Sequence, residues 1–127
     1  MTRTQRYIEM ARKVALQSAF RYRVGCIIVS RGIVIAAECN SLRHQSVLHT
    51  NHWEGSLHSE VAALARVLRD GRREWLKGAS MYVVRVNKAG NLAMALPCHN
   101  CHKEILTSGV KRCYYSNSDG LISEIRL

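Results

Sequence analysis

The sequence predicts a single α/β domain over residues 1–127, built of three layers (α/β/α) around a mixed sheet of five strands. The chain has 127 residues, which suits one hydrophobic core, and apolar residues make up 47% of it. Its strand-like runs are continuously apolar rather than alternating, which is typical of a sheet covered on both faces. Helical patterns stand before, between and after these runs, and they supply the two covering layers.

The first part of the chain is predicted to be a helix followed by a hairpin. Residues 4–20 carry an apolar stripe on one helical face, and Thr4 is the expected N-cap. The apolar runs at residues 24–29 and 33–37 are expected to be strands, and the intervening Arg31-Gly32 is typical of a tight turn. We therefore expect the first two strands to be antiparallel.

After a predicted loop, helices and strands alternate. Residues 41–57 have few apolar side chains, and a loop of this length inside a compact domain is usually functional. Two helices that end near Gly71 and Gly109 and two further strands are expected in the order helix, strand, helix, strand: residues 58–69, 80–86, 98–108 and 112–116. We expect these two helices to lie side by side on one face of the sheet.

The last residues predict a strand that turns back along the sheet. Only seven residues follow Gly120, too few for a helix and a parallel strand, because a parallel crossover needs about a dozen residues or more. Residues 117–120, Asn-Ser-Asp-Gly, are typical of a tight turn. We therefore expect residues 121–125 to form a short antiparallel edge strand.

The net charge indicates which classes of molecule the protein can bind, and the cysteines indicate its cellular compartment. A formal charge of +10 attracts polyanions or phosphorylated small molecules. No apolar run approaches the roughly 20 residues of a membrane helix, and the first residues lack the apolar core of a secretory signal. Two of the five cysteines have metal-ligand spacing, and the others lie in strand-like runs as small buried residues. We expect a cytoplasmic protein that does not bind a membrane.

Three residues have the chemistry and spacing of zinc ligands. Cys98 and Cys101 are three residues apart at the start of a predicted helix, so both thiolates lie on one side and can hold one ion. His58 completes a His-Cys-Cys set and leaves the fourth tetrahedral position for water, as a catalytic zinc requires. A structural zinc, with His99 or His102 as the fourth ligand, and a redox cysteine pair are the alternatives.

Glu60 is the expected catalytic residue beside this ion. It follows His58 by two positions, which in the middle of a helix would point the two side chains about 200° apart. Both can reach one ion and its water only if the helix begins here, so that they project past its first turn. The positive end of the helix dipole at that position also stabilises thiolates and developing anions.

These residues carry a resemblance to a known family. His58-Ser59-Glu60 followed by Pro97-Cys98-His99-Asn100-Cys101 fits the H-x-E and P-C-x-x-C signature of zinc-dependent nucleobase deaminases. Over residues 24–120 the chain resembles the cytidine/deoxycytidylate deaminase superfamily, and above all its small deoxycytidylate-deaminase-like members. Those relatives reach their fifth strand through a helix, so the antiparallel last strand predicted here departs from them.

The resemblance implies a cytidine-deaminase-like fold and a hydrolytic reaction. A cytosine base would be converted to uracil with release of ammonia, using one catalytic Zn²⁺ held by His58, Cys98 and Cys101. Glu60 would take a proton from the attacking water and deliver protons to the ring nitrogen and the departing amine.

The resemblance also suggests residues that contact the substrate: Asn40, Trp53, Ser59 and Ser116. Asn40 follows the second strand, where similar deaminases have an asparagine that contacts the sugar; the alternative is a turn asparagine bonded to its own backbone. Trp53 either stacks on the base or pins its loop to the core. Ser116 follows the fourth strand, where relatives place residues around the base or phosphate. The loop histidines are solvated or bind a second, structural zinc: His44, His49 and His52.

Three functions remain open from the sequence alone. The first is deamination of a free cytidine nucleotide, with deoxycytidylate as the leading small-molecule substrate. The second, which the charge favours, is deamination of single-stranded DNA or RNA, on cytosine or, less expected, adenine. The third is a non-catalytic zinc protein that binds nucleic acid. A homo-oligomer is compatible with each.

Overall fold

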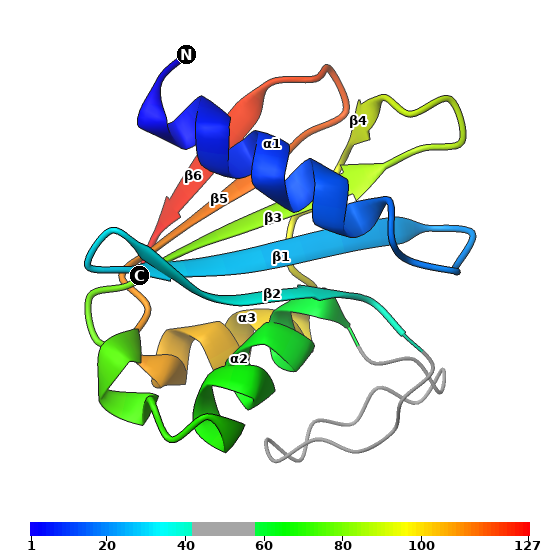
Figure 1. The fold of residues 1–127 in the computed structure, drawn as a ribbon. Helices are drawn as coiled ribbons and strands as arrows, with labels where there is room; N and C mark the ends of the chain where they lie inside the picture. Colours follow the sequence, from blue (N-terminus) through cyan, green and yellow to red (C-terminus); the bar gives the residue numbers. More distant parts are fainter. Residues whose placement is uncertain (42–57) are drawn as a thin grey trace.

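The computed structural model describes residues 1–41 and 58–127 and has three layers (Figure 1). A twisted sheet forms the middle layer. Helix α1 (Arg3–Ala15) covers one face, and helices α2 (Ser59–Arg69) and α3 (His99–Ser108) lie side by side on the other. The predicted α/β/α arrangement is therefore confirmed. Within the described residues, no helix is both long and apolar enough to span a bilayer.

The sheet is mixed and has the strand order β2-β1-β3-β5-β6. Its main strands are β1 (Arg23–Ser30), β2 (Ile33–Cys39), β3 (Ser80–Val86), β5 (Arg112–Ser116) and β6 (Ile122–Arg126). Only β3 and β5 are parallel neighbours among these described strands. The sequence did not predict β4 (Leu92–Ala93), a two-residue strand that pairs with the end of β3, nor the short 3₁₀ helix η1 (Arg73–Leu76).

Two turns that the sequence predicted are present. Arg31 and Gly32 both have positive φ angles, 54° and 76°, as the turn of a two-residue hairpin requires. At the other end of the chain, the Asn117 N–H donates to the Leu121 carbonyl at 3.0 Å, and β6 returns antiparallel to β5. The predicted antiparallel last strand is confirmed.

Helix α1 differs from its prediction at both ends. It begins after Thr2 rather than Thr4, because the Thr2 hydroxyl accepts a hydrogen bond from the Gln5 N–H while the Gln5 side chain accepts one from the Thr2 N–H. It ends at Ala15, about one turn earlier than the apolar stripe predicted. The Ser18 hydroxyl there donates to the Asn40 carbonyl and accepts from the Phe20 N–H, which turns the chain toward β1.

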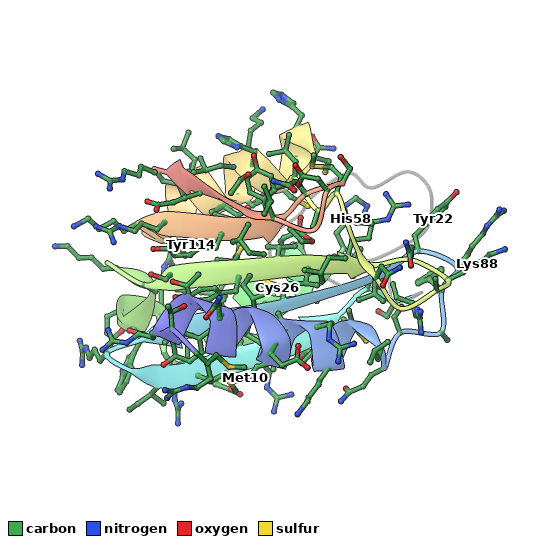
Figure 2. All side chains as sticks on the ribbon, turned by 90° about the horizontal axis from the view of Figure 1, so that it is seen from above. Met10, Tyr22, Cys26, His58, Lys88 and Tyr114 are labelled. Atoms are coloured by element: carbon green, nitrogen blue, oxygen red, sulfur yellow. The ribbon has the colours of Figure 1, made fainter. Side chains whose placement is uncertain are left out.

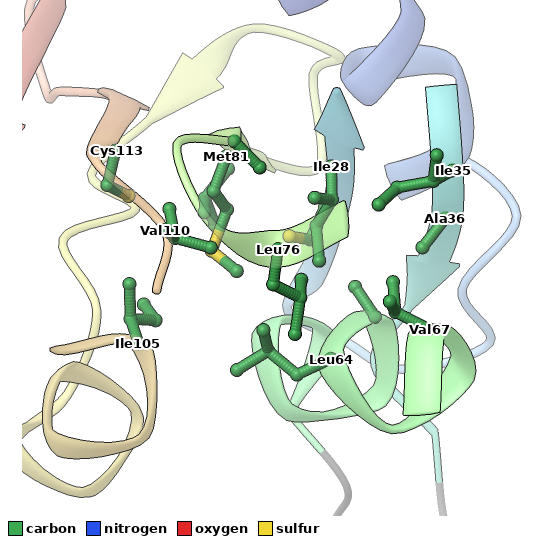
Figure 3. Packing of buried hydrophobic residues seen from close by; sticks show 14 of the residues in the cluster. Ile28, Ile35, Ala36, Leu64, Val67, Leu76, Met81, Ile105, Val110 and Cys113 are labelled. Carbon is green, nitrogen blue, oxygen red and sulfur yellow. The ribbon is translucent and has the colours of Figure 1, made fainter. Parts of the chain in front are cut away.

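Side chains of β1 alternate between two cores. Ile27 and Val29 pack toward α1, whereas Cys26 and Ile28 face α2. Figure 3 shows Ile28 packed with Leu64 and Val67 of α2 on the second face. On the first face, Gly25 lets α1 rest directly on the strand, because a Cβ there would overlap the backbone of Ala11 and Ala15. The resulting rigid sheet positions the residues at the end where β1 begins.

Candidate active site

His58, Cys98 and Cys101 meet where α2 and α3 begin. His58 is the N-cap of α2 and Cys98 the N-cap of α3, so both side chains project beyond the first turns of their helices. The Nδ1 atom of His58 lies 3.6 Å from the Cys98 sulfur and 3.3 Å from the Cys101 sulfur. One ligand atom from each of the three residues lies within 4.8 Å of the others. These separations place three donors around one point.

The donor set fits a zinc ion. A tetrahedral Zn²⁺ with usual Zn–S and Zn–N bond lengths places sulfur and nitrogen ligands about 3.6 Å apart, close to both measured separations. Thiolate and imidazole are the ligands that zinc prefers. In the part of the chain that the structure describes, His99 and His102 do not belong to this group, so neither supplies a fourth ligand. The described residues therefore supply three ligands to this point.

Cys101 is buried, and in the absence of a cation its surroundings favour the neutral thiol. Burial raises the pKa of the Cys101 thiol, and the nearby Glu60 carboxylate and Cys98 sulfur raise it further. A divalent cation at the meeting point reverses that balance, since a coordinating thiol is deprotonated outright. Cys98 is exposed and His58 is half-buried, so an ion can enter from their side.

Glu60 projects from the first turn of α2 into the same site. Its side chain is buried, with 5% of the residue exposed, and its Oε1 accepts a hydrogen bond from the Ser59 hydroxyl at 2.8 Å. Ser59 is itself fully buried. Both lie in the first turn of α2, at the positive end of its helix dipole. Glu60 is thus a fixed carboxylate next to the metal position, suited to move protons.

A cavity of about 580 Å³ opens onto these residues. This volume is in the range of small-molecule sites. Two connections form much of the remaining wall, one after α1 (Phe20, Arg21 and Tyr22) and one before α3 (Met94, Ala95 and Leu96). In Figure 2, His58 and Tyr22 lie toward the same end of the sheet. The cavity therefore joins apolar side chains, two of the three ligands (His58 and Cys98) and one carboxylate.

Asn40 lines the cavity, and its side chain also ties two segments together. The amide oxygen accepts from the Val24 N–H at 3.0 Å, and the amide nitrogen donates to the Tyr22 carbonyl at 2.7 Å. The amide thus bonds to the segment that enters β1, not to its own turn. Within residues 1–41 and 58–127 these bonds use one N–H of the amide, so a structural role and a substrate contact through the other N–H are compatible.

Other predicted contacts have different positions. Ser116 is fully buried and does not line the cavity, because its hydroxyl donates to the Ala93 carbonyl at 2.7 Å and accepts from the Arg85 N–H at 3.1 Å. It joins β3, β4 and β5 instead. Trp53 and the three loop histidines, His44, His49 and His52, lie outside the described residues.

Sequence reasoning missed Arg85, which lines the cavity from β3. Its guanidinium carbon lies 4.5 Å from the centroid of the Tyr22 ring. The available signal was that Arg85 is the one charged residue in the strand Ser80–Val86, which is mostly apolar. The face of the sheet on which its side chain lies could not be known without the fold.

Comparisons with known proteins agree with this site. The family model described as the cytidine and deoxycytidylate deaminase zinc-binding region matches residues 1–117. A search of curated proteins found no match.

Solved structures give a similar result. The dCMP deaminase of the cyanophage S-TIM5 is 27% identical in its apo form, with a TM-score of 0.69 over 95% of this chain and 90% of that chain. The same enzyme in complex with dCMP and dUMP is 26% identical, with a TM-score of 0.68 over 93% of this chain and 85% of that chain. The cytidine deaminase of Mycobacterium tuberculosis shares the fold at 19% identity, with a TM-score of 0.59 over 92% of this chain and 86% of that chain. A zinc-binding family and a donor set that fits the ion give the chain one Zn²⁺ as its cofactor.

Proposed function

Because the chain belongs to the cytidine and deoxycytidylate deaminase zinc-binding family, we propose that it deaminates a cytosine base hydrolytically on a free cytidine nucleotide such as deoxycytidylate. One observation carries the proposal: the buried Glu60 carboxylate lines the same cavity as His58 and Cys98. The similarity to a cyanophage dCMP deaminase, whose structure contains dCMP and dUMP, supports a nucleotide substrate.

The residues divide the work between holding the metal and moving protons. His58, Cys98 and Cys101 would hold the ion at the start of α2 and α3. A zinc ion held there supplies Lewis-acid chemistry that makes water nucleophilic near neutral pH. Glu60 takes a proton from the water that attacks C4 of the base. It then delivers protons to the ring nitrogen and to the amino group, which leaves as ammonia, and uracil remains.

Neighbouring side chains would orient these groups. The Ser59 hydroxyl fixes one oxygen of Glu60, so the carboxylate keeps its second oxygen for the substrate. The remaining amide N–H of Asn40 would donate to the sugar. Apolar side chains in the wall, such as Leu96, would contact the base.

The second candidate is deamination of a base in single-stranded DNA or RNA. The formal charge of +10 favours it, because neutralising phosphates drives binding to nucleic acid. A non-catalytic zinc protein would bind the same polymers without turnover. A reducing cytoplasm remains the proposed compartment, supported by five cysteines of which none forms a disulfide.

A substrate panel separates these functions. We expect the zinc-loaded protein to release ammonia from deoxycytidylate faster than from deoxycytidine or a single-stranded oligonucleotide that contains cytosine. Glu60→Gln is the matched blank, because it keeps size and the Ser59 contact but cannot accept the proton; we expect it to lower kcat by at least about 10³-fold with unchanged zinc content. Turnover confined to the oligonucleotide would select the second function. Oligonucleotide binding without any turnover would select the third.

A further inference from the structure

Arg85 brings a permanent positive charge into the wall of the catalytic cavity. Its backbone is fixed on both sides, since Arg85 pairs with Val24 of β1 and with Ala93 of β4. Its N–H also donates to the buried Ser116 hydroxyl. The backbone from which the side chain starts is therefore held by the sheet on both sides.

The guanidinium is held by an aromatic ring and not by a carboxylate. It lies over Tyr22 at 4.5 Å, and its buried Nε has no hydrogen-bond partner among the residues that the structure describes. Four of the other described arginines lie within 4.0 Å of Asp or Glu: Arg12, Arg66, Arg112 and Arg126. Arg85 differs from the remaining arginines that the structure describes in that its Nε is buried without a partner. An arginine cannot shed its proton, so Arg85 carries a permanent charge in a half-buried place, and no carboxylate among the described residues lies within 4.0 Å of it.

A second arginine adds to the charge at this wall. Arg21 also lines the cavity, and its guanidinium carbon lies 5.7 Å from the same Tyr22 ring. Among the residues that line the cavity, Glu60 is the one carboxylate. It accepts a hydrogen bond from the Ser59 hydroxyl and is assigned to proton transfer in the proposed function. The wall around Tyr22 is therefore positive and lacks a protein anion in the described part of the chain.

We propose that Arg85, assisted by Arg21, binds the phosphate group carried by the sugar of the substrate. The inference rests on the proposed function and names the part of the substrate that this arginine recognises. A guanidinium is planar and presents its N–H groups in a fork that matches two phosphate oxygens, and its contact with the Tyr22 ring restricts where that fork can lie. The recognised group is the monoester of a free nucleotide. Arg85 thereby makes the enzyme prefer nucleotides to nucleosides.

The test compares two substrates that differ only in the phosphate. We expect Arg85→Gln to lower kcat/KM for deoxycytidylate about 100-fold, which corresponds to the loss of a charge-assisted, two-point contact. The loss for deoxycytidine should be at least about tenfold smaller. Arg85→Lys restores part of the loss, since it keeps the charge without the fork. Arg69→Gln is the control, because it removes the same charge from an exposed position on α2.

A binding measurement makes the test independent of turnover. Titration of zinc-loaded protein with deoxyuridylate and with inorganic phosphate should give weaker binding for Arg85→Gln and unchanged binding for Arg69→Gln. If neither substrate is deaminated, the proposed function fails, and this titration alone decides whether Arg85 binds phosphate.

Three outcomes overturn the proposal. Equal losses of kcat/KM on deoxycytidylate and deoxycytidine would give Arg85 a merely structural role. Equal efficiency of the unmodified enzyme on both substrates would remove the preference, although deamination would stand. A loss on an oligonucleotide without a loss on deoxycytidylate would assign Arg85 to the phosphodiester of a strand.

Discussion

The three α-helices that the structure describes begin in two different ways. Helix α1 begins with a reciprocal pair of hydrogen bonds between Thr2 and Gln5, at 3.1 and 2.8 Å. Helices α2 and α3 begin at His58 and Cys98, neither of which makes a side-chain capping hydrogen bond. The helix that only covers the sheet uses its N-cap to stabilise itself. The two helices that form the site use the same position for metal ligands.

The difference has an energetic consequence. A good N-cap contributes about 1 kcal/mol to stability, and α2 and α3 forgo that contribution. An ion held by His58, Cys98 and Cys101 would connect the starts of both helices instead. Because the ion binds only the folded state, it would raise the free energy of unfolding. The face with α2 and α3 should therefore depend on zinc, whereas the face with α1 should not.

Removal of zinc tests this contrast with the largest expected effect. A chelator should lower the free energy of unfolding by about 4 kcal/mol relative to protein with free zinc at a thousandfold excess over its Kd. In hydrogen exchange, amides in the first turns of α2 and α3 should lose protection while those of α1 keep theirs. Equal loss of protection in all three helices would contradict the contrast.

Gly25→Ala disturbs the opposite face. The new methyl group would overlap the backbone of Ala11 and Ala15, so α1 must move away from β1. We expect a loss of about 1–3 kcal/mol in urea unfolding, as for other overpacked cores. Zinc content should be unchanged and the lost protection confined to α1. Loss of zinc in this variant would mean that the two faces are coupled.

The smallest effect comes from the caps themselves. Thr2→Ala should cost about 1 kcal/mol with or without zinc, since it removes the capping hydroxyl of α1. Cys98→Ser gives α3 a good capping residue, so in chelator it should stabilise the protein by up to about 1 kcal/mol. With zinc present it should instead destabilise, because a ligand is lost. If Cys98→Ser changed the free energy of unfolding in the same direction with and without zinc, position 98 would not exchange helix capping for metal binding.

A structural feature could be predicted from the sequence when the residues that determine it lie close together in the chain. His58, Glu60, Cys98 and Cys101 follow from local spacing and from where their helices begin. The antiparallel β6 follows from one turn, residues 117–120. The spacing within each motif and within the turn is local, so it can be read without the fold, whereas the meeting of His58 with Cys98 and Cys101 depends on the packing of α2 beside α3.

Features decided by distant partners escaped prediction. β4 exists because Leu92 and Ala93 pair with Val86 and Arg85, and propensity does not reveal a two-residue strand. The hydroxyl of Ser116, which the sequence predicts as a substrate contact, bridges segments that are remote in the sequence, and this bridge was not predicted. Arg85 faces the cavity only because of its register with β1 and β4.

Parallel strands cannot be joined by a short turn, and this places a limit on how the chain can vary in length. The connection from β3 to the parallel β5 must return from one end of the sheet to the other over one face. Helix α3, which carries Cys101 and begins after Cys98, is part of this connection. Insertions should be well accepted in the hairpin turns at residues 31–32 and 117–120, which join antiparallel neighbours away from that crossing. An insertion at residues 94–98 would shift both cysteines relative to His58, so length there is expected to be fixed.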